Sequence, residues 1–224
     1  MSLILNNSVI HHLPKCGGNF VRYFLSLNNF EFSRIKLSPA YGRQRLFNRE
    51  LSSHNIPHGH PDYESTPNKL VIVREPLSWY RSYWNERLKN RPTNRDEINH
   101  GYWRARDHGD FGFCEVDDLT YSDNFEKWIE NILKHFPYGP FSEFFKYYEL
   151  LSSDVGRVEN LSDDLTKFIK KYENGEITNI PKQKINVSVD LLKAKTSIPL
   201  ELEQEIKKAE TYIYNKYYSD LKTI

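Results

Sequence analysis

The nine residues 12–20, with the sequence HLPKCGGNF, constrain the fold of this chain more than any other stretch. They follow the short apolar run Val9-Ile10 and lead into a helical pattern over residues 20–27. This order predicts a strand, a tight glycine turn and a helix. Glycines let backbone N–H groups approach a ligand closely, and a helix N-terminus adds further N–H groups and a partial positive charge. Together with the charge of Lys15, the stretch predicts a cradle for a phosphate or a related anion.

The position of the lysine separates this loop from the P-loop of nucleotide triphosphatases. In that motif lysine follows the last glycine, and a magnesium-binding Ser or Thr comes next. Here Lys15 precedes Gly17 and Gly18, and Asn19 and Phe20 follow them. The pattern disfavours a metal-dependent kinase or ATPase. A glycine turn that serves packing alone is the other interpretation.

A second strand and helix are expected over residues 70–84. Residues 70–73 form a continuous apolar run, which is typical of a strand buried on both faces. Pro76 suits the first turn of a helix, because its missing N–H has no partner there. Arg74 is therefore expected at the carboxyl end of a central strand, where open α/β sheets bind ligands. Ser82 is expected two turns into the helix.

At these two stretches the chain resembles the sulfotransferases that use 3′-phosphoadenosine 5′-phosphosulfate. The first stretch is similar to the family's 5′-phosphosulfate loop, HIPKTGGTS, and the second to its 3′-phosphate motif, RxPxxRxxSxY. Arg74 and Ser82 keep the spacing of the arginine and serine that hold the 3′-phosphate. Three further segments resemble the family in the same order: His58-Gly59-His60, which is similar to the HGH segment of the 2-O-sulfotransferase branch, residues 156–165 and residues 185–188.

The resemblance implies an α/β, P-loop-like three-layer fold, in which helices flank a central parallel sheet of about four or five strands. It implies 3′-phosphoadenosine 5′-phosphosulfate as cofactor, adenosine 3′,5′-bisphosphate as product and no required metal. The implied reaction moves a sulfuryl group to an acceptor hydroxyl, and the HGH segment favours a hydroxyl on a carbohydrate. The cofactor-binding residues implied are Lys15, Cys16, Gly17, Gly18, Asn19, Phe20, Arg74 and Ser82.

Sulfuryl transfer needs a base for the hydroxyl proton and stabilisation of charge on the departing phosphate. Lys15 and the backbone of residues 17–19 can supply the stabilisation. Histidine suits the base near neutral pH. The resemblance implies His60 as the base and His58 as a supporting residue. The alternative is that His60 is a structural turn residue before Pro61.

Some positions depart from the family's pattern. Cys16 and Asn19 replace two threonines, and Trp79 stands where the family often has a second arginine, with Arg81 two residues on. In an anion-binding turn the Cys16 thiol has either a lowered pKa or the role of a small turn residue. These departures leave open which side chains complete the phosphate shell.

Composition fits one soluble enzyme domain of 224 residues. No run approaches the roughly 18 apolar residues of a membrane span. The N-terminus lacks the pattern of a secretory signal, so we expect a cytoplasmic enzyme without a membrane span. The two cysteines carry no metal-ligand spacing. The net charge of +1 argues against a nucleic-acid partner.

Residues 90–121 are expected to form a long surface loop between helices over 79–88 and 125–133. The loop is either a substrate-covering lid or an ordinary solvated insertion. Charge is segregated around it: residues 81–106 hold seven Lys or Arg and three acids, whereas residues 107–130 hold eight acids and one lysine. The basic block suits an anionic saccharide as acceptor. A last helix is expected over residues 199–218.

Two other functions stay open. The same scaffold can serve as a catalytically inactive nucleotide-binding or carbohydrate-binding module, although Lys15, Arg74, Ser82 and the histidine pair argue against it. A P-loop nucleotide kinase is disfavoured by the position of Lys15 and by the missing Ser or Thr.

Overall fold

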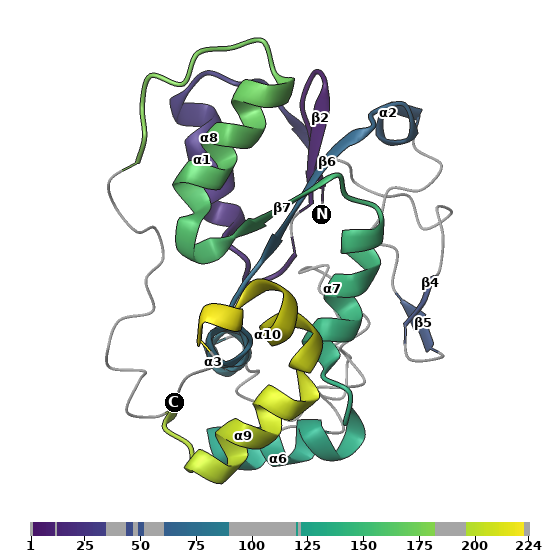
Figure 1. The fold of residues 1–224 in the computed structure, drawn as a ribbon, viewed down its shortest axis with the longest axis vertical. Helices are drawn as coiled ribbons and strands as arrows, with labels where there is room; N and C mark the ends of the chain where they lie inside the picture. The colour runs from purple at the N-terminus through teal and green to yellow at the C-terminus, as the bar shows by residue number, and fades with distance from the viewer. Residues whose placement is uncertain are drawn as a thin grey trace, which may run out of the picture. The chain divides into compact units, whose positions relative to one another are not determined.

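Figure 1 shows the computed structural model of the chain. The structure describes residues 2–11, 13–34, 44–46, 49–51, 61–89, 120, 122–181 and 196–221. These residues form two compact units. The first unit takes its described residues from 1–44, 53–74 and 145–187, and the second takes them from 45–52, 75–144 and 188–224.

The first unit is built on a sheet that has five strands within the described residues, in the order β3-β1-β2-β6-β7. The strands are β1 (Ser2–Ile4), β2 (Ser8–His11), β3 (Ser33–Arg34), β6 (Asn68–Val73) and β7 (Asp154–Arg157). β2, β6 and β7 are parallel, whereas β1 is antiparallel to both of its neighbours. The register places Ile10 opposite Leu70 and Val73 opposite Arg157. The carboxyl ends of three neighbouring strands therefore lie at one edge of the sheet.

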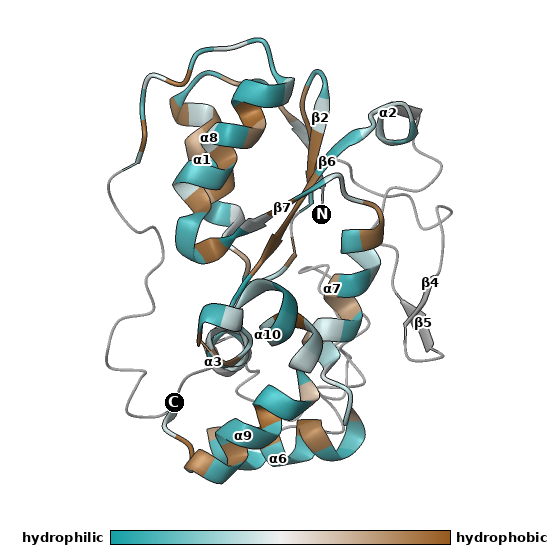
Figure 2. Ribbon diagram, viewed as in Figure 1, coloured by the Kyte–Doolittle hydropathy of each residue, from teal (hydrophilic) through white to brown (hydrophobic). Residues whose placement is uncertain are grey.

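β6 forms the apolar centre of this sheet. Residues 70–73, Leu-Val-Ile-Val, are all buried, and Figure 2 shows β6 turning from hydrophilic to hydrophobic along its length. A strand between two parallel neighbours is covered on both faces, so every side chain in the run is apolar. The predicted strand is confirmed.

Helices cover both faces of the sheet. The helices of the first unit are α1 (Gly18–Leu27), α2 (Pro61–Glu64), α8 (Leu161–Tyr172) and the part of α7 (Pro140–Leu150) from Phe145 onward. Ser8 Oγ donates a hydrogen bond of 2.6 Å to Glu173, next to the end of α8. His11 contacts Tyr63 of α2 and packs against Tyr148 of α7, with ring centroids 5.1 Å apart. Strand residues alternate between faces, so Ser8 and His11 point to opposite sides.

α8 and α1 therefore share one face of the sheet, where they lie side by side in Figure 1. α2 and the end of α7 cover the other face. The short helix η1 (Val158–Asn160) connects β7 to α8.

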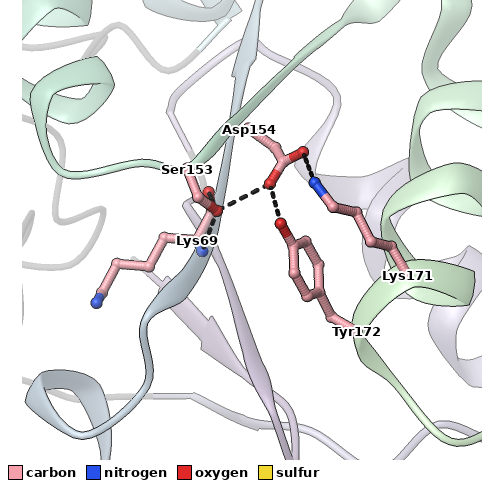
Figure 3. Close-up of polar contacts among 5 residues, drawn as sticks. All are labelled: Lys69, Ser153, Asp154, Lys171 and Tyr172. Atoms are coloured by element: carbon pink, nitrogen blue, oxygen red, sulfur yellow. Dashed lines mark hydrogen bonds and ion pairs between the residues drawn. The ribbon is translucent and has the colours of Figure 1, made fainter.

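A polar cluster joins the start of β7 to the end of α8 (Figure 3). Asp154 accepts hydrogen bonds of 2.8 Å from Ser153 Oγ and from the Tyr172 hydroxyl, and it pairs with Lys171 Nζ at 3.1 Å. Ser153 Oγ also accepts a hydrogen bond from the Lys69 amide. The cluster lies at the amino edge of the parallel strands, away from the edge where those strands end.

The second unit is helical and aromatic. Its helices are α3 (Pro76–Lys89), α6 (Phe125–His135), the first residues of α7, α9 (Leu200–Ala209), α10 (Thr211–Tyr217) and the short η4 (Ser219–Leu221). Trp79 of α3 stacks on Phe141 and on Tyr83, with centroids 4.6 and 4.9 Å apart. Such rings bury large apolar areas in few residues. A separate two-stranded sheet pairs β4 (Gln44–Leu46) with β5 (Arg49–Leu51).

A buried carboxylate, that of Glu210, accepts several hydrogen bonds within the second unit. Glu210, which is 0% exposed, lies between α9 and α10. It accepts hydrogen bonds from the Tyr80 hydroxyl at 2.7 Å and from the amides of Phe141 and Ser142 at 3.1 and 2.7 Å. The two amides belong to the first turn of α7, so Glu210 caps that helix. The predicted helix over 199–218 is two helices, α9 and α10, which meet at Glu210.

The predicted α/β class is confirmed, and so is a mostly parallel sheet with helices around it. β1 is an exception that the sequence did not predict. It joins β2 through a tight turn closed by the Leu5 amide and the Ser8 carbonyl, 2.9 Å apart, and a turn this short allows only antiparallel pairing. Over the part of the chain that is described, no helix has the length and apolar character to cross a membrane.

Candidate anion-binding site

The loop between β2 and α1 turns sharply through two left-handed residues. Lys15 has φ 61° and Gly17 has φ 80°. The Cys16 amide donates to the Leu13 carbonyl at 3.2 Å, which closes the turn. A left-handed backbone is costly for a residue with a Cβ and persists where the surroundings hold it. The conformation of Lys15 therefore points to specific support around the loop.

Arg74 contacts this turn directly. It follows the last residue of β6, as predicted, and its Nη1 donates a hydrogen bond of 2.8 Å to the Lys15 carbonyl. Arg74 is half-buried. The two basic residues that the sequence predicted for separate ends of a ligand are thus brought together within the first unit.

α1 begins directly after this turn. Gly17 is its N-cap and makes no side-chain capping bond, and the first turn contains no acidic residue. In a helix the first amides, here those of Gly18, Asn19 and Phe20, have no acceptor within the helix itself. These amides and the helix dipole favour an anion at this point.

Gly17 is required by its backbone and by its neighbour. A Cβ placed on Gly17 would lie 2.5 Å from Leu161 Cδ2, at the start of α8. The left-handed φ of 80° also favours glycine at this position. The loop is therefore packed closely against the start of α8, which belongs to the same unit.

Cys16 has a structural role in the loop. Its side chain is 1% exposed, and burial raises the pKa of its thiol, although the charges of Arg74 and Lys15 act in the opposite direction. The lowered pKa considered from the sequence is therefore wrong, and the interpretation as a small turn residue is favoured. A buried, protonated thiol does not offer a ligand a charge.

The other residues of the loop have mixed surroundings. The side-chain carbonyl of Asn19 accepts a hydrogen bond from Arg22, one turn further along α1. Phe20 stacks on Phe24, with ring centroids 6.3 Å apart. Asn19 thus holds a further basic side chain near the start of the helix, which sequence reasoning did not identify.

The remaining predicted site residues are less connected. Ser82 is half-buried on α3 in the second unit, so its place in the site rests on its sequence spacing from Arg74. His58 and His60 lie outside the described residues, as do His12, most of the segment 90–121 and residues 185–188. The roles predicted for His58, for His60 and for the loop over residues 90–121 stay predictions.

Two charged residues near Arg74 were not assigned from sequence. Arg157 is the last residue of β7 and pairs in register with Val73, so it ends at the same edge of the sheet as Arg74. Its position follows once 154–157 is recognised as a strand parallel to β6. Glu75 caps α3, because its carboxylate accepts hydrogen bonds of 3.0 and 2.6 Å from the backbone amides of Leu77 and Ser78.

The described part of the site can bind an anion by charge and by backbone amides. No cluster of metal-binding side chains is found among the described residues. Comparisons with known proteins add no identity: no family model, no curated protein and no solved structure matches this chain.

Proposed function

We propose that the protein is a sulfotransferase that moves a sulfuryl group from 3′-phosphoadenosine 5′-phosphosulfate to an acceptor hydroxyl. The observation that carries the proposal is the Lys15 turn, held by Arg74, at the uncapped start of α1. It lies after a parallel strand, where open α/β sheets bind ligands. The resemblance of this loop to the 5′-phosphosulfate loop of sulfotransferases supports the 5′-phosphosulfate group of the cofactor as the anion.

The proposed reaction uses this turn to stabilise the leaving group. The acceptor oxygen forms a bond to sulfur while the bond from sulfur to the 5′-phosphate oxygen breaks, and that phosphate gains negative charge. Lys15 and the amides of Gly18, Asn19 and Phe20 face the growing charge. Positioned donors and charges of this kind supply most of the catalysis in related group transfers. His60 takes the proton of the acceptor hydroxyl, with His58 supporting it.

The rest of the nucleotide is assigned from the sequence spacing. Arg74 and Ser82 hold the 3′-phosphate in this proposal, and the whole fold is of the P-loop-like three-layer type. The acceptor is a carbohydrate, and the basic block over residues 81–106 favours an anionic one. The enzyme works in the cytoplasm and needs no metal.

One binding experiment tests the nucleotide. Titration calorimetry would compare adenosine 3′,5′-bisphosphate in EDTA with ATP in magnesium. We expect the bisphosphate to bind without metal and Lys15→Ala to weaken that binding by roughly 1.5–3 kcal/mol, the value of a hydrogen bond to a charged group. Lys171→Ala is the matched control, since it removes one positive charge at the amino edge of the same sheet. If ATP binds in the presence of magnesium and the bisphosphate does not bind, a kinase is favoured instead.

A second experiment tests the reaction. The protein would be incubated with sulfur-labelled cofactor and a panel of sulfated and neutral saccharides and small phenols. Label transferred to a saccharide supports the proposal, and transfer to phenols only would refute the choice of acceptor. Tight binding of the bisphosphate with no transfer to any acceptor would favour an inactive nucleotide-binding module.

A further inference from the structure

We propose that Arg74 is a positioning residue for the Lys15 turn. Binding of the 5′-phosphate and binding of the 3′-phosphate would then both depend on Arg74. This inference rests on the proposed nucleotide site. It assigns to Arg74 a role that its sequence motif does not predict, since that motif pairs the arginine with Ser82 at the other end of the nucleotide.

The contact that carries the inference joins the ends of two neighbouring strands. Arg74 follows β6, Lys15 follows β2, and the hydrogen bond from Nη1 to the Lys15 carbonyl is 2.8 Å long. A charged donor on a carbonyl makes a strong hydrogen bond. It fixes the orientation of the peptide that follows Lys15, and with it the direction in which the next amides point.

The backbone of Lys15 makes such support necessary. A φ of 61° is uncommon for a residue with a side chain and costs roughly 1–3 kcal/mol. Other contacts of the turn include the bond from the Cys16 amide to the Leu13 carbonyl and the packing of Gly17 on Leu161. The first closes the turn across Lys15, from Leu13 to Cys16, and the second lies after Lys15, whereas Arg74 bonds directly to the Lys15 carbonyl. Without Arg74 the carbonyl loses its charged partner and the turn can relax toward a less strained backbone.

The guanidinium also lies close enough to Cys16 for its charge to act on that thiol. Its charge is the largest of those that lower the pKa of the buried Cys16 thiol, against the larger opposing effect of burial. A guanidinium carries five N–H donors, and the contact with Lys15 uses one nitrogen. The same side chain can therefore hold the turn and still face a phosphate. Its two roles are separable by ligands that differ in one phosphate.

The test compares adenosine 5′-phosphate with adenosine 3′,5′-bisphosphate in wild type, Arg74→Ala and Lys171→Ala. If Arg74 positions the turn, Arg74→Ala weakens the binding of adenosine 5′-phosphate by about tenfold, which corresponds to about 1.4 kcal/mol. Lys171→Ala leaves both affinities unchanged. If Arg74→Ala binds adenosine 5′-phosphate as tightly as wild type and loses affinity for the bisphosphate alone, Arg74 contacts only the 3′-phosphate and the inference is overturned.

A measurement without nucleotide separates this inference from the proposed function. Hydrogen exchange at the amides of residues 16–20 should be at least several-fold faster in Arg74→Ala, while the amides of β6 and α8 keep their protection. Unchanged exchange at residues 16–20 would refute the positioning role. If the wild type binds neither nucleotide, the proposed function fails, and the exchange result still decides what Arg74 does to the turn.

Discussion

Gly17 and Leu161 are packed so closely that a Cβ on the glycine would lie 2.5 Å from the leucine Cδ2. This relationship ties the candidate anion-binding loop to the first residue of α8, which follows β7. The loop thus contacts both Arg74, which directly follows β6, and Leu161, the first residue of α8. Any side chain at position 17 disturbs both the backbone and this contact.

Gly17→Ala should lower the free energy of unfolding by roughly 1–3 kcal/mol, because it adds strain at a φ of 80° to an overpacked contact. Gly175→Ala is a matched control: its Cβ would also lie 2.5 Å from a side-chain atom, Phe30 Cε1, but its φ is outside the left-handed region. Urea denaturation would compare the two. Adding Leu161→Ala should relieve only the steric part of the Gly17→Ala defect. An equal loss in both glycine variants would show that φ contributes nothing.

Asp154→Asn should destabilise the protein at neutral pH, and this effect should shrink as the pH falls below the unfolded pKa of the aspartate. Burial raises the pKa of Asp154, but hydrogen bonds from Ser153, Tyr172 and Lys171 outweigh it and hold the pKa below its ordinary value of 3.8. A carboxyl with a lowered folded pKa contributes stability above its unfolded pKa and loses it as the pH falls through the folded pKa. The contribution at pH 7 is about 1 kcal/mol, since the side chain is 26% exposed.

The measurement is urea denaturation of wild type and variant from pH 2 to pH 7. Asp123→Asn, at an exposed aspartate, is the control for the loss of one negative charge. A stability difference between wild type and Asp154→Asn that stays constant over this range would show that the carboxylate charge is not what the cluster uses.

Glu210 should give the opposite pH dependence. Burial raises the pKa of Glu210 above its ordinary value of 4.5, and the hydrogen bonds from Ser142, Tyr80 and Phe141 offset only part of that effect. A carboxyl with a raised folded pKa stays protonated longer in the native state, so stability falls as the pH rises from about 4.5 through the folded pKa. Glu210→Gln cannot ionise and should lack this fall.

Glu210→Ala should lower the free energy of unfolding by more than Glu210→Gln does, at any pH. It removes the acceptor for three buried donors, from Tyr80, Phe141 and Ser142, and each buried donor left without an acceptor costs about 1–3 kcal/mol. Because neighbouring groups relax together, we expect a total of roughly 2–5 kcal/mol by denaturation. Glu205→Gln, at an exposed glutamate of α9, is the control. A Glu210→Gln curve parallel to that of wild type would contradict the raised pKa.

Local patterns predicted the parts of the site that depend on local physics. The apolar run 70–73 and Pro76 were enough to place Arg74 between β6 and α3. The glycine pair and the helical pattern after it were enough to place the loop before α1. Each of these elements is long or strongly punctuated, so periodicity identifies it.

Contacts between distant residues were outside the reach of such patterns. The bond from Arg74 to Lys15 spans 59 residues, and the capping of α7 by Glu210 spans 68 or 69. β1 has only three residues, too few for alternation to be visible. Burial of Cys16 also depends on tertiary packing, so the sequence left a lowered thiol pKa open beside the role of a small turn residue, and only the fold decides between them.

His60→Ala should lower the turnover of sulfuryl transfer by roughly 10²–10⁴-fold, the usual contribution of a positioned acid or base. The affinity for adenosine 3′,5′-bisphosphate should hardly change, because the proposed base acts on the acceptor and the nucleotide is held by Lys15 and Arg74. Steady-state kinetics with labelled cofactor would give the turnover, and calorimetry would give the affinity.

His58→Ala is the comparison within the same segment and should retain more turnover than His60→Ala. Near-normal turnover in His60→Ala, together with loss of activity in His58→Ala or Glu75→Gln, would assign the base to another residue. A Glu75 variant must also be checked for folding, since Glu75 caps α3.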